Sequence, residues 1–499
     1  MNRRALLACA AIATLAAVLT LHRLGAADVC LKNEAHDGVF VQLMVERGEL
    51  IFPLQNGLEP MFKPPLFHWS ATALHRILDI GKVTPTSLRL AAALYAVAGV
   101  ILAMIFAWWA LGPRGAVFTG LALIACYHYV EKGRIGRVDM TLTFFESLGL
   151  FSIAWWLGGA GTSDRDSGSG ARGVPGSRGF IYLAALALGL AVLSKGPVGA
   201  ILPSLAVLVY LSIERRWSDL RALISPGPLA VGVAVASSWY LACFFAGYSV
   251  NLRYQLGIEN YGRFVGNLGA MAPWYYVAPS LIHSPVVSAL AALAVLFAIA
   301  RNLPVARDLH AASNARARVA VRLFAIFWVV TLVLFSLAAY KRRVYLLPLW
   351  PSSAVLIAWL VDGASHLRWR ARLRGAYVAV CLALAAGNFV YIPYAEVEAC
   401  KGRYPRIAAA KVNQVVARDQ PLYMLGFTDW IEELLFHLDR DAPRMRRDLV
   451  NRSDIYVLTS IDYWKTLSRR RPDLVPLLVY TDSKPEVVVL KWRPRLASP

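Results

Sequence analysis

Long uninterrupted apolar runs constrain this chain more than any other feature of its sequence. They are about 17–25 residues long, which lets an α-helix cross the hydrocarbon core of a bilayer, about 30 Å thick. The whole chain is 58% hydrophobic and only 17% charged, whereas soluble domains are about 45–50% apolar and about 25% charged. The sequence therefore predicts an α-helical polytopic membrane protein.

The runs predict about eleven transmembrane helices when the amino terminus is placed in the cytoplasm. The first run, 5–22, follows Arg3 and Arg4 and precedes the small residues 25–27, so a cleaved signal peptide is the alternative to a retained span. We favour a retained span, because later segments then obey the rule that cytoplasmic loops are rich in Lys and Arg. The spans are expected near 5–22, 86–111, 115–130, 140–160, 179–194, 197–213, 228–247, 279–300, 322–340, 344–361 and 375–394.

The net charge of +21 invites a nucleic-acid interpretation, but the positions of the cations exclude it. Most cations flank spans on the predicted cytoplasmic side, as in the Gly/Ser-rich stretch 158–178 and the arginine-rich connections 301–322 and 368–374. The exception is Lys-Arg-Arg at 341–343, which falls on the outer side. A cation retained against the charge rule often has a function.

Two larger segments lie on the predicted periplasmic side. The first loop, 23–85, is long for a helix connection, and its stretch 34–46 has an apolar stripe suited to a helix in the membrane interface or packed on another helix. We expect a transmembrane domain at 1–394 and a small periplasmic α/β domain at 395–499. In that domain strands are expected at 419–427, 454–459, 475–480 and 486–491, and helices at 429–439 and 461–470.

The six cysteines show neither a CxxC motif nor metal-ligand spacing. Four of them lie in apolar runs, where packing is the ordinary role. Cys30 and Cys400 both fall on the outer side, so a disulfide between them and two unpaired thiols are both open.

Ionisable residues near the outer ends of the spans form six clusters. Cations and carboxylates on one side of the membrane suit displacement at a sugar carbon with a phosphate leaving group. Cations stabilise the charge on the departing phosphate, and a carboxylate takes the proton of the attacking hydroxyl. The clusters are Asn33–Glu34 with His36 and Asp37; Lys63–Pro64–Pro65 with His68; Arg134, Arg137 and Asp139; Ser194–Lys195–Gly196–Pro197; Glu259, Asn260 and Arg263; and Lys341, Arg342, Arg343 and Tyr345.

Taken in order, these clusters resemble the integral-membrane GT-C glycosyltransferases, in the branch of protein O-mannosyltransferases and the lipid A aminoarabinose transferase (glycosyltransferase family 39-like). That pattern is an Asp-Glu pair in the first outer loop, Lys-Pro-Pro-Leu, an Asp at the head of the fourth span, and Ser-Lys-Gly-Pro. The likeness covers roughly residues 30–350 and implies a GT-C fold. The matching residues are Asn33–Glu34, Lys63–Leu66, Asp139 and Ser194–Pro197.

The resemblance also implies roles for single residues. The family's first acid, its catalytic base, is Asn33 here, and an amide is no useful base near neutral pH. Glu34 is the best substitute, with Asp37 and Asp139 behind it. Residues expected to hold the donor phosphate are Lys63, Lys195, Arg263, Lys341 and Arg342, and residues expected to bind substrate are Arg137, Glu259 and Tyr345.

Some relatives carry a Glu before the Lys-Pro-Pro-Leu run and a later His, suited to a metal. Here Phe62 and the stretch 270–271 stand there, so we expect neither metal nor cofactor. Simpler roles remain open for other residues: Lys63 can reach lipid headgroups from a stiff Pro-Pro turn, Asp139 can cap its helix, and Asn33 can mark a weak or inactive homologue.

The sequence therefore predicts an inverting glycosyltransferase of the bacterial inner membrane. It would move a sugar from a polyprenyl-phosphate donor to a periplasmic acceptor, with lipid A or another glycolipid favoured over a protein. The alternatives are a protein O-mannosyltransferase-like enzyme, a transporter or flippase, and a non-catalytic subunit. Transporters tend to show internal repeats and sites near the bilayer midplane, whereas the charges here gather at one surface.

Overall fold

The computed structural model resolves the chain into two compact units. Unit 1 comprises Met1–His22, Phe62–Phe67 and Leu90–Ile392, and unit 2 comprises Arg23–Met61, His68–Arg89 and Pro393–Pro499. We call them the helical unit and the mixed unit. The structure describes residues 3–56, 59–61, 63–159, 177–262, 265–266, 284–301, 315–339, 342–363, 369–427, 432–438, 440–446, 449, 452, 455–482 and 484–494.

Apolar helices account for most of the helical unit. Among the residues that the structure describes, six helices are long and apolar enough to cross a membrane, and five more are apolar but shorter. The long ones are α1 (Arg3–Leu21), α4 (Pro85–Leu111), α7 (Val138–Gly158), α11 (Pro226–Phe245), α16 (Ala315–Leu337) and α18 (Arg370–Ala399). The shorter ones are α5 (Pro113–Ala125), α8 (Gly179–Lys195), α9 (Val198–Ile213), α15 (Pro285–Arg301) and α17 (Leu349–Gly363).

Each expected span falls on one of these helices, so the predicted polytopic helical fold is confirmed. The run 115–130 differs in detail, because the chain is extended at Cys126 and a separate helix α6 (Tyr127–Gly133) follows α5. Short helices complete the unit: α10 (Trp217–Leu223), α12 (Ser249–Arg253), the π-helix η1 (Tyr254–Gly262) and the 3₁₀-helix η6 (Arg343–Leu346).

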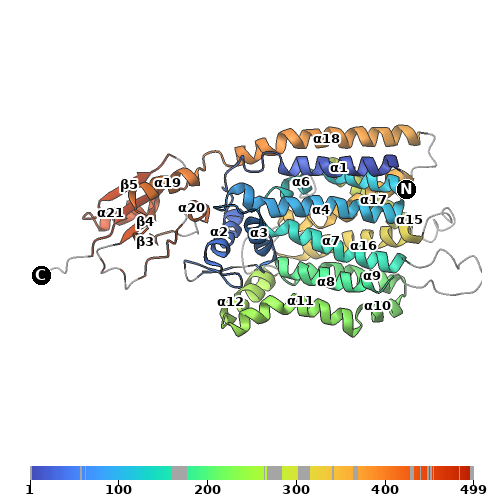
Figure 1. Ribbon diagram of the computed structural model, residues 1–499, viewed down its shortest axis with the longest axis horizontal. Helices are drawn as coiled ribbons and strands as arrows, with labels where there is room; N and C mark the ends of the chain where they lie inside the picture. Colours follow the sequence, from blue (N-terminus) through green and yellow to red (C-terminus); the bar gives the residue numbers. More distant parts are fainter. Residues whose placement is uncertain are drawn as a thin grey trace, which may run out of the picture. The chain divides into compact units, whose positions relative to one another are not determined.

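Helices α7 and α8 pack side by side, and α8 also packs on α11 (Figure 1). Small residues permit this close approach. A Cβ atom at Gly149 would lie 2.8 Å from Leu188, and one at Gly189 would lie 2.9 Å from the carbonyl oxygen of Gly232. The pairing brings the first turn of α7 to the last turn of α8, and this juxtaposition builds the candidate site.

The mixed unit combines helices with a four-stranded sheet of order β3-β4-β6-β5. Strands β3 and β4 are parallel and the other neighbours antiparallel, around a core that includes Val457, Val488 and Leu490. Its helices are α2 (Lys32–Arg47), α3 (Leu66–Ile77), α19 (Pro405–Val415), α20 (Glu432–Leu438) and α21 (Ile461–Arg470). Its strands are β1 (Leu54–Gln55), β2 (Glu59–Pro60), β3 (Leu422–Leu425), β4 (Tyr456–Ser460), β5 (Pro476–Tyr480) and β6 (Val487–Lys491).

The sequence anticipated most of these elements. The four expected strands, the helix at 34–46 and the helix at 461–470 are present. Helix α2 packs on α20 within the mixed unit, and Phe40 of its apolar stripe contacts His68 of α3; packing on another helix is one of the two roles left open for the stripe. Helix α19 was not expected; it begins at Pro405, a residue favoured at a first helical position, and buries only small residues and Val412.

Candidate functional site

A cavity of about 430 Å³ lies in the helical unit. Its walls are mostly apolar, and its polar lining residues come from distant parts of the chain. An apolar cavity with a few convergent polar groups is the usual form of a ligand site. The polar residues are Lys63, Glu146, Lys195, Asn260, Tyr261 and Tyr345; the apolar ones include Leu142, Ile201, Leu202, Leu334, Phe335 and Val344.

The Ser-Lys-Gly-Pro motif places one of the two lysines. Lys195 is the last residue of α8, where a cation interacts favourably with the helix dipole. Gly196 follows with φ of +95°, a conformation that favours glycine, and α9 begins after Pro197. A Cβ atom at Gly196 would lie 3.1 Å from Oδ1 of Asn260, so the turn sits tightly on η1.

Lys195 makes two contacts that fix its ammonium group. Its Nζ atom donates to Oδ1 of Asp139 at 2.5 Å and lies 5.0 Å from the centre of the Tyr345 ring, within cation–π range. Arg137 adds a second cation, with Nη2 3.4 Å from Oδ2 of Asp139. Asp139 is in the first turn of α7 and only 4% exposed, so it balances two cations besides favouring its helix terminus.

Glu146 lies two turns along α7 from Asp139 and lines the same cavity. Its side chain is buried, and in the described part of the chain neither carboxyl oxygen has a hydrogen-bond partner. The sequence analysis did not include it. The available signal was a carboxylate inside an apolar run, which is rare without a function.

In the mixed unit, Glu34 is bound by a cation that the sequence analysis missed. Nε of Arg89 donates to Oε1 of Glu34 at 2.7 Å, and Nη2 donates to Oε2 at 2.9 Å. Both side chains are buried. Nη1 of Arg89 also donates to the carbonyls of Leu24 and Ala27, and Nη2 to that of Asp28. The pair therefore holds the chain segment that precedes α2.

Asp37 has different neighbours from Glu34. Its Oδ1 atom lies 3.3 Å from Nε2 of His68 and 3.8 Å from Nδ1 of His36. Asp37 and His68 are fully buried, whereas Asn33, in the first turn of α2, is exposed. The three candidates on α2 therefore differ in their surroundings: Asn33 is exposed, Glu34 is paired with Arg89, and Asp37 lies beside two histidines.

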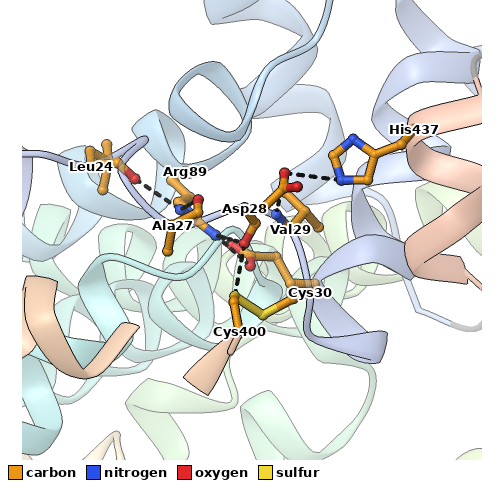
Figure 2. The surroundings of a disulfide bond; sticks show 9 residues. Leu24, Ala27, Asp28, Val29, Cys30, Arg89, Cys400 and His437 are labelled. Carbon is orange, nitrogen blue, oxygen red and sulfur yellow. Dashed lines mark hydrogen bonds and ion pairs between the residues drawn. A yellow bond between two sulfur atoms is a disulfide. The ribbon is translucent and has the colours of Figure 1, made fainter. Parts of the chain in front are cut away.

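A disulfide joins Cys30 to Cys400 beside the chain segment that precedes α2 (Figure 2). The same view shows Asp28, whose Oδ1 atom lies 3.1 Å from Nε2 of His437. Burial opposes the ionisation of Asp28, but the His437 hydrogen bond and charge, the Val29 amide and Arg406 together hold its pKa below the usual value. The pairing of the two outer cysteines was one of the two alternatives that the sequence left open.

The remaining predicted site residues divide by what the structure describes. Arg342 directly precedes η6 and is half-buried. Arg263 and Lys341 lie outside the described residues, as does the side chain of Glu259, whose backbone belongs to η1. The structure therefore brings together Lys63, Lys195, Tyr345, Asp139 and Arg137 in the helical unit, and Asn33, Glu34 and Asp37 on α2.

Comparison with known proteins finds several similar chains. No family model matches the chain. An undecaprenyl phosphate-alpha-4-amino-4-deoxy-L-arabinose arabinosyl transferase from Edwardsiella ictaluri is 27% identical over 329 residues, which cover 64% of this chain and 53% of the relative. The protein of the same name from Enterobacter sp. is 28% identical over 49% of this chain and 39% of the relative. The chain thus spans about half the length of the curated relatives it matches.

Solved structures match over more of the chain. The crystal structure of ArnT from Cupriavidus metallidurans bound to undecaprenyl phosphate covers 100% of both chains with a TM-score of 0.76 and 19% identity. The archaeal oligosaccharyltransferase AglB from Archaeoglobus fulgidus matches 93% of this chain and 70% of its own, with a TM-score of 0.54 and 12% identity. The GT-C fold expected from the sequence motifs is confirmed.

Proposed function

We propose that this chain, which has a GT-C fold, is an integral-membrane glycosyltransferase that takes a sugar from a polyprenyl-phosphate donor. One observation carries the proposal: a single cavity combines two lysines, Lys63 and Lys195, with apolar walls. A prenyl phosphate has the complementary parts, an anionic head and a hydrocarbon tail. The ArnT structure that shares the fold is bound to undecaprenyl phosphate, which supports the same ligand class here.

The lysines serve the departing phosphate. When the acceptor hydroxyl attacks the anomeric carbon, the bond from that carbon to the phosphate oxygen breaks, and its electron pair stays on the phosphate. Lys63 and Lys195 stabilise this charge. Attack from the opposite face inverts the anomeric centre, and the hydroxyl proton passes to a carboxylate. Arg137, Arg263, Lys341 and Arg342 remain candidate phosphate or substrate contacts, as do Glu259 and Tyr345.

Asp139 competes with the ligand for Lys195 in this proposal. It holds Lys195 at 2.5 Å, so an incoming phosphate competes with a carboxylate for the same ammonium. Since the two anions repel each other, the pair limits how tightly the product prenyl phosphate is retained. The phosphate can then leave after transfer.

The identity of the catalytic base stays a prediction among Glu34, Asp37 and Asp139. Both oxygens of Glu34 accept hydrogen bonds from Arg89, so the carboxylate is already engaged by a buried cation. Asp37 faces histidines instead, and a neutral histidine can accept a proton in turn. We therefore rank Asp37 above Glu34, which reverses the order expected from the sequence.

The acceptor and the compartment belong to the proposal as well. We propose a glycolipid acceptor such as lipid A, on the likeness of the Lys63–Leu66 loop to the aminoarabinose branch. We place the chain in the bacterial inner membrane with the mixed unit in the periplasm. The Cys30–Cys400 disulfide supports this orientation, since disulfides persist in oxidising compartments.

The test supplies radiolabelled polyprenyl-phosphate sugar and lipid A to the purified protein and compares Lys195→Met with wild type. We expect labelled lipid A from wild type and at least a tenfold lower rate from the variant, about 1.4 kcal/mol in the barrier. Lys132→Met is the matched control, because Lys132 pairs with Glu131 on α6 and does not line the cavity. Uptake of the labelled donor into sealed vesicles without transfer would overturn the proposal in favour of a flippase.

A further inference from the structure

Glu146 is a buried acid in the cavity wall for which the proposed chemistry has no use. Only 1% of its surface is exposed, and among the described residues neither Oε atom accepts or donates a hydrogen bond. Burying an unpaired carboxylate in apolar surroundings is costly, whereas the uncharged acid has a much smaller penalty. The buried Glu146 carboxyl group must therefore either have a charged or hydrogen-bonding partner or be uncharged.

The charged and titratable groups around the cavity do not supply that partner. Besides Glu146, the charged and titratable residues that line the cavity are Lys63, Lys195, Tyr261 and Tyr345. Asp139 lies on the same helix as Glu146. Lys195 is committed to Asp139 and to the Tyr345 ring. Among the described residues, Glu146 forms no ion pair with Lys63 or Lys195. The uncharged acid is the form that these surroundings favour.

The direction of the side chain suits a ligand held by Lys195. Seven residues separate Glu146 from Asp139, about 10 Å along the helix axis. Helical side chains tilt towards the amino-terminal end of their helix, and for Glu146 that is the end of α7 that carries Asp139. Leu142 lines the cavity one turn nearer to Asp139, which places both residues on the cavity face of α7.

We propose that Glu146 acts as an uncharged carboxylic acid that donates a hydrogen bond to the phosphate of the prenyl-phosphate ligand. A protonated carboxyl group has one O–H donor, and a phosphate offers acceptor oxygens. An ionised Glu146 would repel the same phosphate. The inference rests on the proposed function, since it takes the prenyl phosphate as the occupant of the cavity.

Infrared difference spectroscopy tests the protonation state directly. The spectrum of wild type minus Glu146→Gln should contain the C=O band of a protonated carboxylic acid at neutral pH. Adding undecaprenyl phosphate should shift this band in wild type, because a new hydrogen bond changes the C=O stretch. Glu131→Gln, which alters an acid paired with Lys132, should leave the band in place. The inference would be overturned if the band were absent, or if its frequency did not change when undecaprenyl phosphate is added.

Affinity for undecaprenyl phosphate gives a second, independent readout. Glu146→Gln keeps a neutral hydrogen-bond donor and should bind within about twofold of wild type. Glu146→Leu removes the donor and should bind about 10- to 100-fold more weakly, as expected for one hydrogen bond to a charged group. A large loss in Glu146→Gln with an unchanged thermal midpoint would show that the charge matters and refute the neutral role. If wild type itself does not bind undecaprenyl phosphate, the proposed function fails instead.

Discussion

At the scale of single residues, the ion pair between Glu34 and Arg89 decides how activity data on the first loop should be interpreted. We expect Glu34→Gln to lower the free energy of unfolding by about 3–5 kcal/mol, because it leaves the buried Arg89 charge uncompensated. Arg89→Met should cost at least as much, since the carbonyls of Leu24, Ala27 and Asp28 also lose a donor. Thermal unfolding of the full-length protein measures both. A Glu34→Gln protein with wild-type stability and no sugar transfer would restore Glu34 as the leading base.

Asp139→Asn should strengthen the binding of undecaprenyl phosphate. The substitution removes the carboxylate that competes for Lys195, so undecaprenyl phosphate should bind about tenfold more tightly, or about 1.4 kcal/mol. Product release should slow accordingly. Titration of undecaprenyl phosphate against the two proteins measures the difference. Asp219→Asn is the control, because Asp219 pairs with Arg216 on the short helix α10 and lines no part of the cavity. Weaker binding by Asp139→Asn would mean that Asp139 orients Lys195 more than it competes.

Residue types near span ends singled out Lys63, Lys195 and Tyr345, which line one cavity in the structure; a cation at the break between two apolar runs, such as Lys195, is conspicuous in a sequence. They were not enough to find Arg89 or the environment of Glu146. Arg89 lies near the start of the expected span 86–111 and Glu146 lies within the expected span 140–160, and whether such a group is paired depends on what packs beside it. Tertiary packing decides which residue pairs with a buried charged group, so the pairing could not be predicted from one sequence.

At the scale of elements, the turn between α8 and α9 positions Lys195 in the cavity wall. Gly196→Ala should destabilise the protein by about 1–3 kcal/mol, the usual range for a residue held in a sparsely populated conformation. The new Cβ atom would also press on Asn260 and move Lys195, so the affinity for undecaprenyl phosphate should fall severalfold. Gly247→Ala is a matched control with φ of +87° and no neighbouring atom within 4 Å. It should lose stability without losing affinity, and equal affinity losses in both variants would contradict this account.

The β1–β2 hairpin carries a pH prediction. Burial raises the pKa of Glu59 from 4.5 to about 7, although Arg444 and Asn56 act against the shift. Between these two values the folded protein retains a proton that the unfolded chain has lost. The free energy of unfolding should therefore fall as pH rises through this window and level off above pH 7. The stability difference between wild type and Glu59→Gln, measured from pH 4 to pH 8, should show this slope; a flat difference would refute it.

Elements were the most predictable level of this structure. Length and hydropathy located the apolar helices, and the four strands expected after Tyr394 correspond to β3, β4, β5 and β6. The break at Cys126 and the π-helical turn of η1 were not predicted, since no proline or glycine marks the first and the second departs from the ordinary helical period. Irregular backbone of this kind depends on tertiary contacts, which local patterns do not report.

At the scale of the whole molecule, contacts group the first loop with the carboxy-terminal segment. Residues 23–61 and 68–89 belong to the same compact unit as 393–499, a grouping that a change in hydropathy near Tyr394 does not reveal. Long-range contacts such as that of Arg47 with Asp441 support it. Sequence order separates these segments by more than three hundred residues, so only the fold shows that they form one unit.

The Cys30–Cys400 disulfide makes this grouping testable. It joins residues 370 positions apart, and such a link mainly restricts the unfolded chain. Cys30→Ser should lower the stability of the full-length protein by about 2–4 kcal/mol, seen as a lower thermal midpoint that reducing agent no longer changes. Cys9→Ser removes a thiol outside the disulfide and should leave the response to reducing agent intact.

The same bond reports orientation in cells. Its two cysteines should resist alkylation in protein extracted without reductant, because a periplasmic position exposes them to oxidising conditions. They should become reactive after reduction, and a strain that lacks periplasmic thiol oxidation should yield them already reduced. Alkylation with a mass tag, read as a shift in gel mobility, separates these outcomes. Free thiols at both positions in normal cells would place the mixed unit in the cytoplasm, and the proposed use of an outer-leaflet donor would then be untenable.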